Sequence, residues 1–387
     1  MNKNLTRRAF MSRALLQGQA LAVGGGLLPL SSFSHGSGFQ VSGPLQAPDS
    51  NGLRLPKGYR SRIVGVSGKT VENSDYTWHQ SPDGGACFAA FDGGWVYVSN
   101  SEEYFPRGGV GAIAFDVKGN IINAYSILQG TVGNCAGGAT PWQTWLSCEE
   151  VNCGAVYETD PFGKKSAIKR PALGFFKHEA VAVDADQGQL YLTEDEKDGC
   201  LYRFTPSNPL PDLSAGTLEV AIVDTQQRVT WQAINEPNPW NTPLSTRTRH
   251  QVKEAYKFKG GEGIWYQKGL ILFSTKRDNR IWVLDVKEQA ISVLYEAKDE
   301  NAVLSGVDNL AMTPSGDLLI AEDGGDMQLV LLNAQGEPTP LLQVTGQPGS
   351  ELTGPAFSPD GSRLYFSSQR GHHSEKRLGI TYEVSAI

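Results

Sequence analysis

The sequence predicts an all-β fold, and more specifically a six-bladed β-propeller, from two observations. An apolar run that ends in small or acidic residues recurs six times, and turns containing Pro and Gly separate the strands. The first core residues of successive runs lie about 50, 45, 80, 48 and 46 positions apart, within the range of four-stranded propeller blades. A pair of β-sandwiches would not explain this period. The runs are 94–103, 144–150, 189–196, 269–278, 317–324 and 363–371.

The turn sequences fit hairpins between the strands of a blade. "SPDG" (81–84), "TPSG" (313–316) and "SPDG" (358–361) each combine a proline that fixes φ with a glycine that tolerates positive φ. The last two stand directly before repeated runs, as expected for a hairpin between the first two strands of a blade. The interval of about 80 residues predicts an insertion near 205–260, rich in Pro, Asn and Thr, which we expect to be an excursion loop. Residues 35–387 should then form a single propeller domain.

The N-terminus is typical of a twin-arginine export signal that covers residues 1–34. Arg7 and Arg8 precede a short, weakly apolar stretch that Gln17 and Gln19 interrupt, so this stretch spans a bilayer poorly. We therefore expect a periplasmic or secreted protein with no stable membrane anchor, whose partner during export is the twin-arginine translocase. We expect the mature protein to be a monomer.

Charge and motifs exclude several classes of function. The net charge of -7 argues against a nucleic-acid partner, whose phosphates would be repelled, and suits a protein that holds multivalent cations. The chain contains no GxSxG, no Walker-type loop and no HExxH, so nucleophile-elbow, P-loop and zincin chemistry have no support.

Acidic residues gather at the ends of the repeated runs. With the runs aligned on their core residues, acid pairs follow three of the six, namely Glu149-Glu150, Glu194-Asp195 and Glu322-Asp323. A requirement of the fold would place acids in most blades, so their restriction to some blades indicates a local site. Converging carboxylates repel one another unless they are protonated or bind a cation. The sequence therefore predicts a metal site where the strand ends meet.

More candidate ligands lie nearby in the chain. Glu102 ends the first run, and one strand before later runs stand Glu179, Glu262 and Asp308. Oxygen ligands in this number suit Ca²⁺. The thiol of Cys148 suits a softer or more Lewis-acidic ion, iron or zinc, although a single cysteine in a strand is more often a small buried apolar residue. Arg277, near the end of the fourth run, and Arg280, just after it, are candidate contacts for an anionic substrate, although each could also be a surface charge.

The chain resembles the PhoX-type alkaline phosphatase family, as a short member. The resemblance rests on "NCAGGATPWQTWLSCEE", "KHEAVAVD", "YLTED" and "DNLAMTPSGDLLIAEDG", together with the twin-arginine start. It implies a six-bladed propeller with an oxo-bridged iron pair and calcium ions, and a small phosphoester as substrate. The chain departs from the family at Ser101, where a His is usual, and in the short segment before "RIWVLD".

The resemblance also assigns roles to individual residues. Cys148 would be the iron-binding thiolate, with Glu149 and Glu150 in the same catalytic cluster. The residues that match acidic motif positions, and would supply ligands to Fe³⁺ or Ca²⁺, are Glu179, Glu194, Glu262, Asp308 and Glu322.

The expected function is therefore an exported metal-dependent phosphomonoesterase, in which a metal-held oxide or hydroxide attacks the phosphate ester. Two alternatives stay open at this point. One is a calcium-propeller lactonase or esterase, which needs no thiolate, so iron found by elemental analysis would count against it. The other is a non-catalytic propeller with structural calcium sites, which would turn over no ester.

Overall fold

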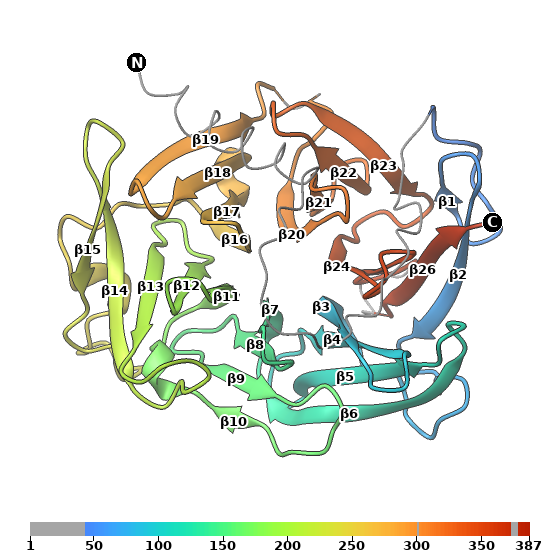
Figure 1. Ribbon diagram of the computed structural model, residues 1–387, viewed down its shortest axis with the longest axis horizontal. Coiled ribbons are helices and arrows are strands. Elements are labelled where there is room, and N and C mark those ends of the chain that lie inside the picture. The colour runs from blue at the N-terminus through green and yellow to red at the C-terminus, as the bar shows by residue number, and fades with distance from the viewer. Residues whose placement is uncertain (1–42, 300–301, 373–377) are drawn as a thin grey trace, which may run out of the picture.

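Six antiparallel sheets stand radially around a central channel, which confirms the predicted six-bladed propeller (Figure 1). The computed structural model describes residues 43–299, 302–372 and 378–387. The predicted export signal, residues 1–34, lies outside the described residues. No helix in the described ranges combines the length and the apolar character needed to cross a membrane.

The blades follow one another along the chain. Blade 1 comprises β3 (Pro82–Ala89), β4 (Trp95–Ser101), β5 (Gly108–Phe115) and β6 (Ile121–Thr131). Blade 2 comprises β7 (Asn134–Ala139), β8 (Trp145–Glu149), β9 (Val156–Thr159) and β10 (Ile168–Lys169). Blade 3 comprises β11 (His178–Asp184), β12 (Gln189–Glu194), β13 (Leu201–Pro206), β14 (Gly216–Val223) and β15 (Val229–Ala233).

The second half of the ring has the same plan. Blade 4 comprises β16 (Gly261–Gln267), β17 (Leu270–Thr275), β18 (Arg280–Asp285) and β19 (Ala290–Glu296). Blade 5 comprises β20 (Val307–Met312), β21 (Leu318–Glu322), β22 (Gln328–Leu332), β23 (Pro338–Val344) and β1 (Leu53–Arg54). Blade 6 comprises β24 (Leu352–Phe357), β25 (Arg363–Ser368), β26 (Ile380–Ala386) and β2 (Tyr59–Val66). The described residues also form the single-turn 3-10 helices η2 (Pro171–Leu173), η3 (Thr248–His250) and η4 (Lys276–Asp278).

The two ends of the chain close the ring together. The early strand β2 forms the outermost strand of blade 6 by pairing with β26, from Tyr59 opposite Ala386 to Val66 opposite Ile380. The short strand β1 likewise adds to the outer edge of blade 5 by pairing with β23. Pairing of the first strands with the last blades holds the ring shut without a covalent link, and it covers two sheet edges that would otherwise be exposed.

The repeated apolar runs form the second strand of every blade, next to the innermost strand that lines the channel. Their apolar side chains fill the spaces between neighbouring blades. One such core joins blades 2 and 3 through Leu146, Cys148, Leu190 and Tyr202, each at most 1% exposed. Burial of these faces stabilises the fold by roughly 25 cal/mol for each Å² of apolar surface removed from water.

The turn and insertion predictions need two corrections. The first "SPDG" segment is not a turn, because Pro82 begins β3 and Asp83 lies within that strand. The segment 205–260 is not an excursion loop throughout, because its first part forms β14 and β15 of blade 3. Leu218 and Val220 of β14 alternate with more exposed residues and pack into the core between blades 2 and 3, which is why this part of the segment is ordered as strand.

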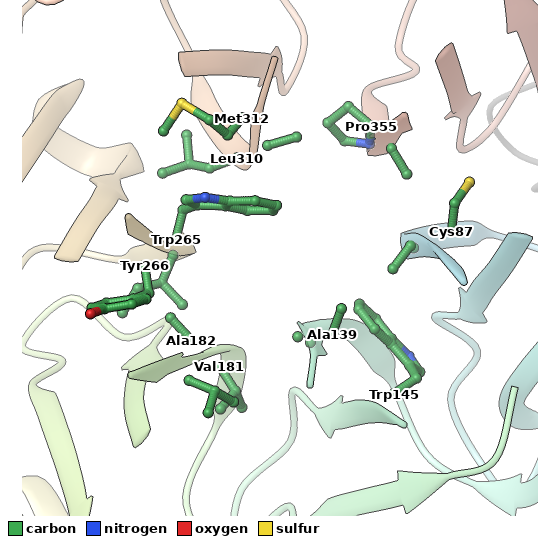
Figure 2. Close-up of a pocket in the computed structure, with 18 of the residues that line it drawn as sticks. Cys87, Ala139, Trp145, Val181, Ala182, Trp265, Tyr266, Leu310, Met312 and Pro355 are labelled. Carbon is green, nitrogen blue, oxygen red and sulfur yellow. The ribbon is translucent and has the colours of Figure 1, made fainter. Parts of the chain in front are cut away.

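The innermost strands β3, β7, β11, β16, β20 and β24 line the channel, and the later parts of these strands surround an apolar pocket of about 310 Å³. Figure 2 shows Val181, Trp265, Leu310 and Met312 around this pocket, with Pro355 on its other side. The charged residues described below lie at the beginning of the same strands. The two ends of the channel therefore differ in chemistry.

Candidate metal centre

Each innermost strand carries a β-bulge near its start. In every blade, two residues of the innermost strand lie opposite one residue of the second strand. In blade 3, for example, the two residues between His178 and Val181 lie opposite one residue of β12. A bulge turns its side chains out of the regular alternation and is frequent next to functional sites. The first residues of the six bulges, here called the bulge positions, are Asp83, Cys135, Glu179, Glu262, Asp308 and Gly354.

A second set of side chains meets the first at the same end of the channel. These are the first residues after the second strands, here called the mouth positions: Glu102, Glu150, Asp195, Lys276, Asp323 and Gln369. Blade 6 has no acid at either position, and Glu351, directly before β24, supplies one instead. Gln369 donates from Nε2 to Asp83 Oδ2 at 2.5 Å and to Glu102 Oε2 at 2.8 Å.

The described residues contain four groups of three residues that could hold a metal ion. Within each group, the three potential ligand atoms lie within 4.8 Å of one another. They are Cys135, Glu150 and Glu179; Asp83, Glu102 and Glu351; Glu179, Glu262 and Asp308; and Asp308, Asp323 and Glu351. Each group draws on at least two blades, so the geometry depends on the closed ring. The four groups together contain eight carboxyl groups and one thiol. Asp195, which pairs with Lys177 at the same end of the channel, is a ninth carboxyl group.

Burial makes these acids costly to ionise. Asp83, Glu179 and Glu262 are at most 2% exposed. Burial, with further contributions from neighbouring carboxylates, raises the pKa of Asp83 and of Glu179 well above the usual range. For Glu262, burial raises the pKa well above the usual range even though Lys276 opposes the shift. Burial also raises the pKa of Glu150 to about 7, against the opposing charge of Lys177.

Only one of the two oxygens of the buried Glu179 carboxylate has a hydrogen-bond partner among the described residues. One of its oxygens, Oε1, accepts from the Cys135 thiol at 3.2 Å. The other, Oε2, is buried and has no hydrogen-bond partner among the described residues. A buried carboxylate oxygen without a partner costs on the order of 1–3 kcal/mol, which a bound cation would remove.

Four cationic side chains lie among the acids. Lys177 Nζ lies 2.7 Å from Glu150 Oε1 and 3.1 Å from Asp195 Oδ2. Burial opposes ionisation of Asp195, but Lys177 and Lys276 outweigh it, and the pKa of Asp195 is lowered. The remaining cations are Lys276, Arg277 and Arg370.

The structure places the two cysteines of the "NCAGG…SCEE" segment differently. Cys148 is fully buried in the apolar core between blades 2 and 3 and belongs to none of the four groups. Cys148 is the residue of β8 that lies opposite the bulge of β7. The residues at the same place in blades 3 and 4, Thr193 and Ser274, also face the next blade, and each donates a hydrogen bond to a backbone carbonyl in the bulge of that blade. Cys135, on the bulge itself, is the thiol that lies beside Glu150 and Glu179.

Three predicted acids brace loops instead of facing the channel. Glu149 accepts hydrogen bonds from the backbone N–H groups of Val132 and Ala155 at 3.1 and 3.0 Å. Glu322 accepts from the backbone N–H groups of Ser305 and Gln328, both at 3.0 Å.

Glu194 has the corresponding place in blade 3. It accepts from the N–H of Cys200 and from the Tyr202 hydroxyl, and it pairs with Arg249 at 3.0 Å. In all three blades the glutamate accepts from the N–H six residues later, which closes the turn between the second and third strands. None of the three belongs to a potential metal group.

The other predicted residues divide as follows. The residues that the structure brings together at the mouth are Glu102, Glu150, Glu179, Asp195, Glu262, Asp308 and Asp323. Arg277 also lies there, 3.7 Å from Asp195 Oδ1. Arg280 lies apart from them, since its guanidinium pairs with Glu296 at the end of the outer strand β19 and with Asp278 in η4.

The sequence alignment of the runs was wrong in two blades. Alignment on the first core residues puts Ser99-Asn100 and Ser274-Thr275 at the places that the acid pairs occupy in other blades, but β4 extends to Ser101 and β17 to Thr275. The reason is that second strands vary in length, from five residues in β8 to seven in β4. Glu102 and Lys276 therefore occupy the mouth positions of blades 1 and 4.

Sequence reasoning missed six residues at the mouth: Asp83, Cys135, Lys177, Lys276, Glu351 and Arg370. A usable signal was present for two of them. In five innermost strands an acid or thiol is followed by a residue no larger than Asn, as in Asp83-Gly84 and Cys135-Ala136. Aligning the innermost strands, and not only the second strands, would have selected both.

A cavity of about 580 Å³ opens beside Glu150 and Lys177. Tyr104, Asn152 and Asn241 line it as well, so its walls carry hydrogen-bonding groups as well as charges. The cavity opens from solvent onto acids of blades 2 and 3, Glu150 and Glu196 among them.

Comparison with known proteins identifies the family. The family model described as alkaline phosphatase PhoX matches residues 102–155, 151–288 and 275–371, which is more than half of the chain. The chain belongs to the PhoX family. This confirms the resemblance found in the sequence. No curated protein sequence matches the chain.

Solved structures support the same fold. PhoX of Pseudomonas fluorescens, in complex with vanadate as a transition state analogue, is similar with a TM-score of 0.71 and 17% identity, over 90% of this chain and 98% of that one. A gluconolactonase from Xanthomonas campestris is similar with a TM-score of 0.52 and 12% identity, over 90% and 99% of the two chains. At these identities the likeness establishes the propeller fold, not the reaction.

Proposed function

We propose that this PhoX-family chain is an exported, metal-dependent phosphomonoesterase with its metal centre at the acidic mouth of the propeller. The observation that carries the proposal is the buried Glu179 carboxylate, whose Oε2 has no partner among the described residues and which lies beside Cys135 and Glu150. Family membership and the vanadate complex of a similar protein support phosphate chemistry.

The donor set fits iron and calcium. Cys135 supplies one soft ligand, and Glu150 and Glu179 supply hard oxygens beside it, a combination that suits iron. The neighbouring group of Asp83, Glu102 and Glu351 offers oxygen atoms alone, which suits Ca²⁺. We therefore propose Cys135, in place of Cys148, as the thiolate ligand. When bound, such ions would stabilise charge on the phosphoryl oxygens and activate the attacking nucleophile.

The side chains of this chain would position the substrate. Lys177, one quarter exposed, borders the cavity beside Glu150. Arg277 lies 3.7 Å from Asp195, the other carboxylate that contacts Lys177. We propose that these two cations orient the phosphate group, because charge neutralisation and positioning are the main demands of phosphoryl transfer. The carboxylates of Glu150 and Asp195 hold Lys177 in place, at 2.7 and 3.1 Å.

The proposal is tested by hydrolysis of p-nitrophenyl phosphate by the full chain supplied with iron and calcium. Turnover should stop on chelation, return on restoring the metals, and fall by about 100-fold or more in Glu179→Gln. Cys87→Ala, which alters a thiol in the apolar pocket at the other end of the channel, is the matched control and should retain turnover. Undiminished hydrolysis after exhaustive chelation would contradict the proposal, as would hydrolysis of a lactone but not of the phosphate.

We also propose export by the twin-arginine route to the periplasm or the medium. The support is the Arg7-Arg8 pair and the weakly apolar stretch after it. N-terminal sequencing of the exported protein should place the cleavage near residue 34.

A further inference from the structure

Lys276 stands where other blades place an acid. The mouth position holds a carboxylate in blades 1, 2, 3 and 5, as with Glu150 in blade 2 and Asp323 in blade 5. In blade 4 the same position, directly after β17, holds Lys276. A lysine at a position that is otherwise acidic reverses the local charge at one point of the mouth.

The ammonium group of Lys276 is surrounded by carboxylates. Its Nζ lies 3.2 Å from Glu262 Oε1, 3.3 Å from Asp308 Oδ2 and 3.1 Å from Asp323 Oδ2. These acids come from two blades and include members of two of the four potential metal groups. Glu262 Oε1 is buried and has no hydrogen-bond partner among the described residues, so its charge is balanced by the ammonium beside it.

The backbone fixes Lys276 in this position. Its N–H donates to the carbonyl of Gly260 at 2.8 Å, which ties the start of η4 to the segment before β16. Lys276 directly follows β17, which pairs with the strand β16 that carries Glu262, so the backbone holds the lysine next to this acid. The Lys276 side chain is about one third exposed, so its ammonium group stays partly hydrated while it contacts the acids.

An ammonium and a metal ion compete for the same oxygens. Ca²⁺ binds oxygen at about 2.3–2.6 Å, closer than the ammonium lies to these three carboxylates. Both cannot occupy the space between Glu262, Asp308 and Asp323, because two cations so close would repel strongly. The lysine supplies one positive charge there without any ion.

We propose that Lys276 is a built-in cation that takes the place of one metal ion at the mouth, between Glu262, Asp308 and Asp323. Metal ions then bind only in the half of the mouth built from Cys135, Glu150 and Glu179 and from Asp83, Glu102 and Glu351. The inference rests on the metal centre proposed above, and it concerns how many ions that centre holds.

The test counts metal ions in the full chain by elemental analysis and by calorimetric titration with CaCl2. Lys276→Met removes the charge and should bind one more Ca²⁺ per chain than the wild type. Lys276→Arg keeps the charge and should bind the wild-type number. In the Lys276→Met background, adding Asp323→Asn should remove the extra ion, whereas Asp323→Asn alone should leave the wild-type number unchanged.

The outcomes separate this inference from the metal centre itself. Equal numbers of ions in the wild type and in Lys276→Met would overturn it, because the lysine would then not be excluding an ion from the space between these acids. If Lys276→Met does not fold, Asp323→Asn decides alone, and loss of an ion in that variant would overturn the inference. Absence of bound metal from every variant and from the wild type would overturn both this inference and the proposed metal centre.

Discussion

Two cysteines thirteen positions apart have opposite environments, and their difference shows what a single residue contributes. Cys135 lies on a bulge beside two carboxylates, whereas Cys148 lies in an apolar core. Burial and the charges of nearby carboxylates raise the pKa of both thiols well above the usual value. A thiol in such surroundings is deprotonated only if a metal ion compensates the charge, and only Cys135 has the accompanying ligands for one.

The two cysteines can be separated by substitution. Cys135→Ala should reduce phosphatase turnover by about 100-fold or more, because it removes a proposed ligand, with little effect on the stability of the metal-free protein. Cys148→Ala should lower the free energy of unfolding by about 1 kcal/mol, because it leaves a small cavity in the core. Urea denaturation in the presence of a chelator measures the stability of both variants. A larger loss of stability in Cys135→Ala than in Cys148→Ala would contradict these assignments.

At this scale the structure brings several of the predicted acids together but places the predicted thiol apart from them. Glu179, Glu262 and Asp308 were selected from their place before the repeated runs, and the structure brings them within one group. Cys148 was selected because acids follow it directly, and adjacency in a strand is misleading, since successive side chains point to opposite faces. Cys135 was not selected because only the second strands were aligned, whereas Cys135 lies on an innermost strand.

The element that recurs most regularly is the glutamate at the end of a second strand. In blades 2, 3 and 5 this residue accepts a hydrogen bond from the N–H six residues later. The closure of a turn explains this recurrence, so the glutamates at these three positions need no metal ion to account for them. The true mouth residue is the next one along, which in blade 4 is a lysine.

Glu322→Gln should lower the free energy of unfolding by about 1–3 kcal/mol at pH 5 without changing the number of bound metal ions. The reason is that glutamine offers one acceptor oxygen, whereas Ser305 and Gln328 present two backbone N–H groups. Urea denaturation and elemental analysis measure the two quantities. Loss of a metal ion in this variant would show that Glu322 is a ligand after all.

The same variant predicts a pH dependence. Burial raises the pKa of Glu322 from 4.5 to about 7 in the folded state, so the folded protein binds this proton more tightly than the unfolded chain. The stability that Glu322 contributes is therefore complete below pH 4.5 and is lost as the pH rises through 7. The difference in stability between wild type and Glu322→Gln should shrink from pH 5 to pH 8. A difference that grows over this range would contradict the assignment.

At the scale of the whole molecule, the mouth exists only because the ring closes. Its ligand groups combine residues from blades 1 to 6, and the pairing of β2 with β26 completes the circle. The sequence predicted the number of blades because the apolar run of each one recurs about 45–50 residues after the last, with a single longer interval. It could not predict the closure by early strands, because pairing between residues more than 300 positions apart leaves no local signal.

The central claim is that the closed ring assembles a metal centre in which Cys135 is the thiol ligand. Elemental analysis of the chain, purified after export by the organism that encodes it, tests this most directly when wild type, Cys135→Ala and Cys148→Ala are measured together. We expect iron and calcium in the wild type, retention of both in Cys148→Ala, and loss of iron in Cys135→Ala. A wild-type chain with neither metal, or equal iron in the wild type and Cys135→Ala, would contradict it.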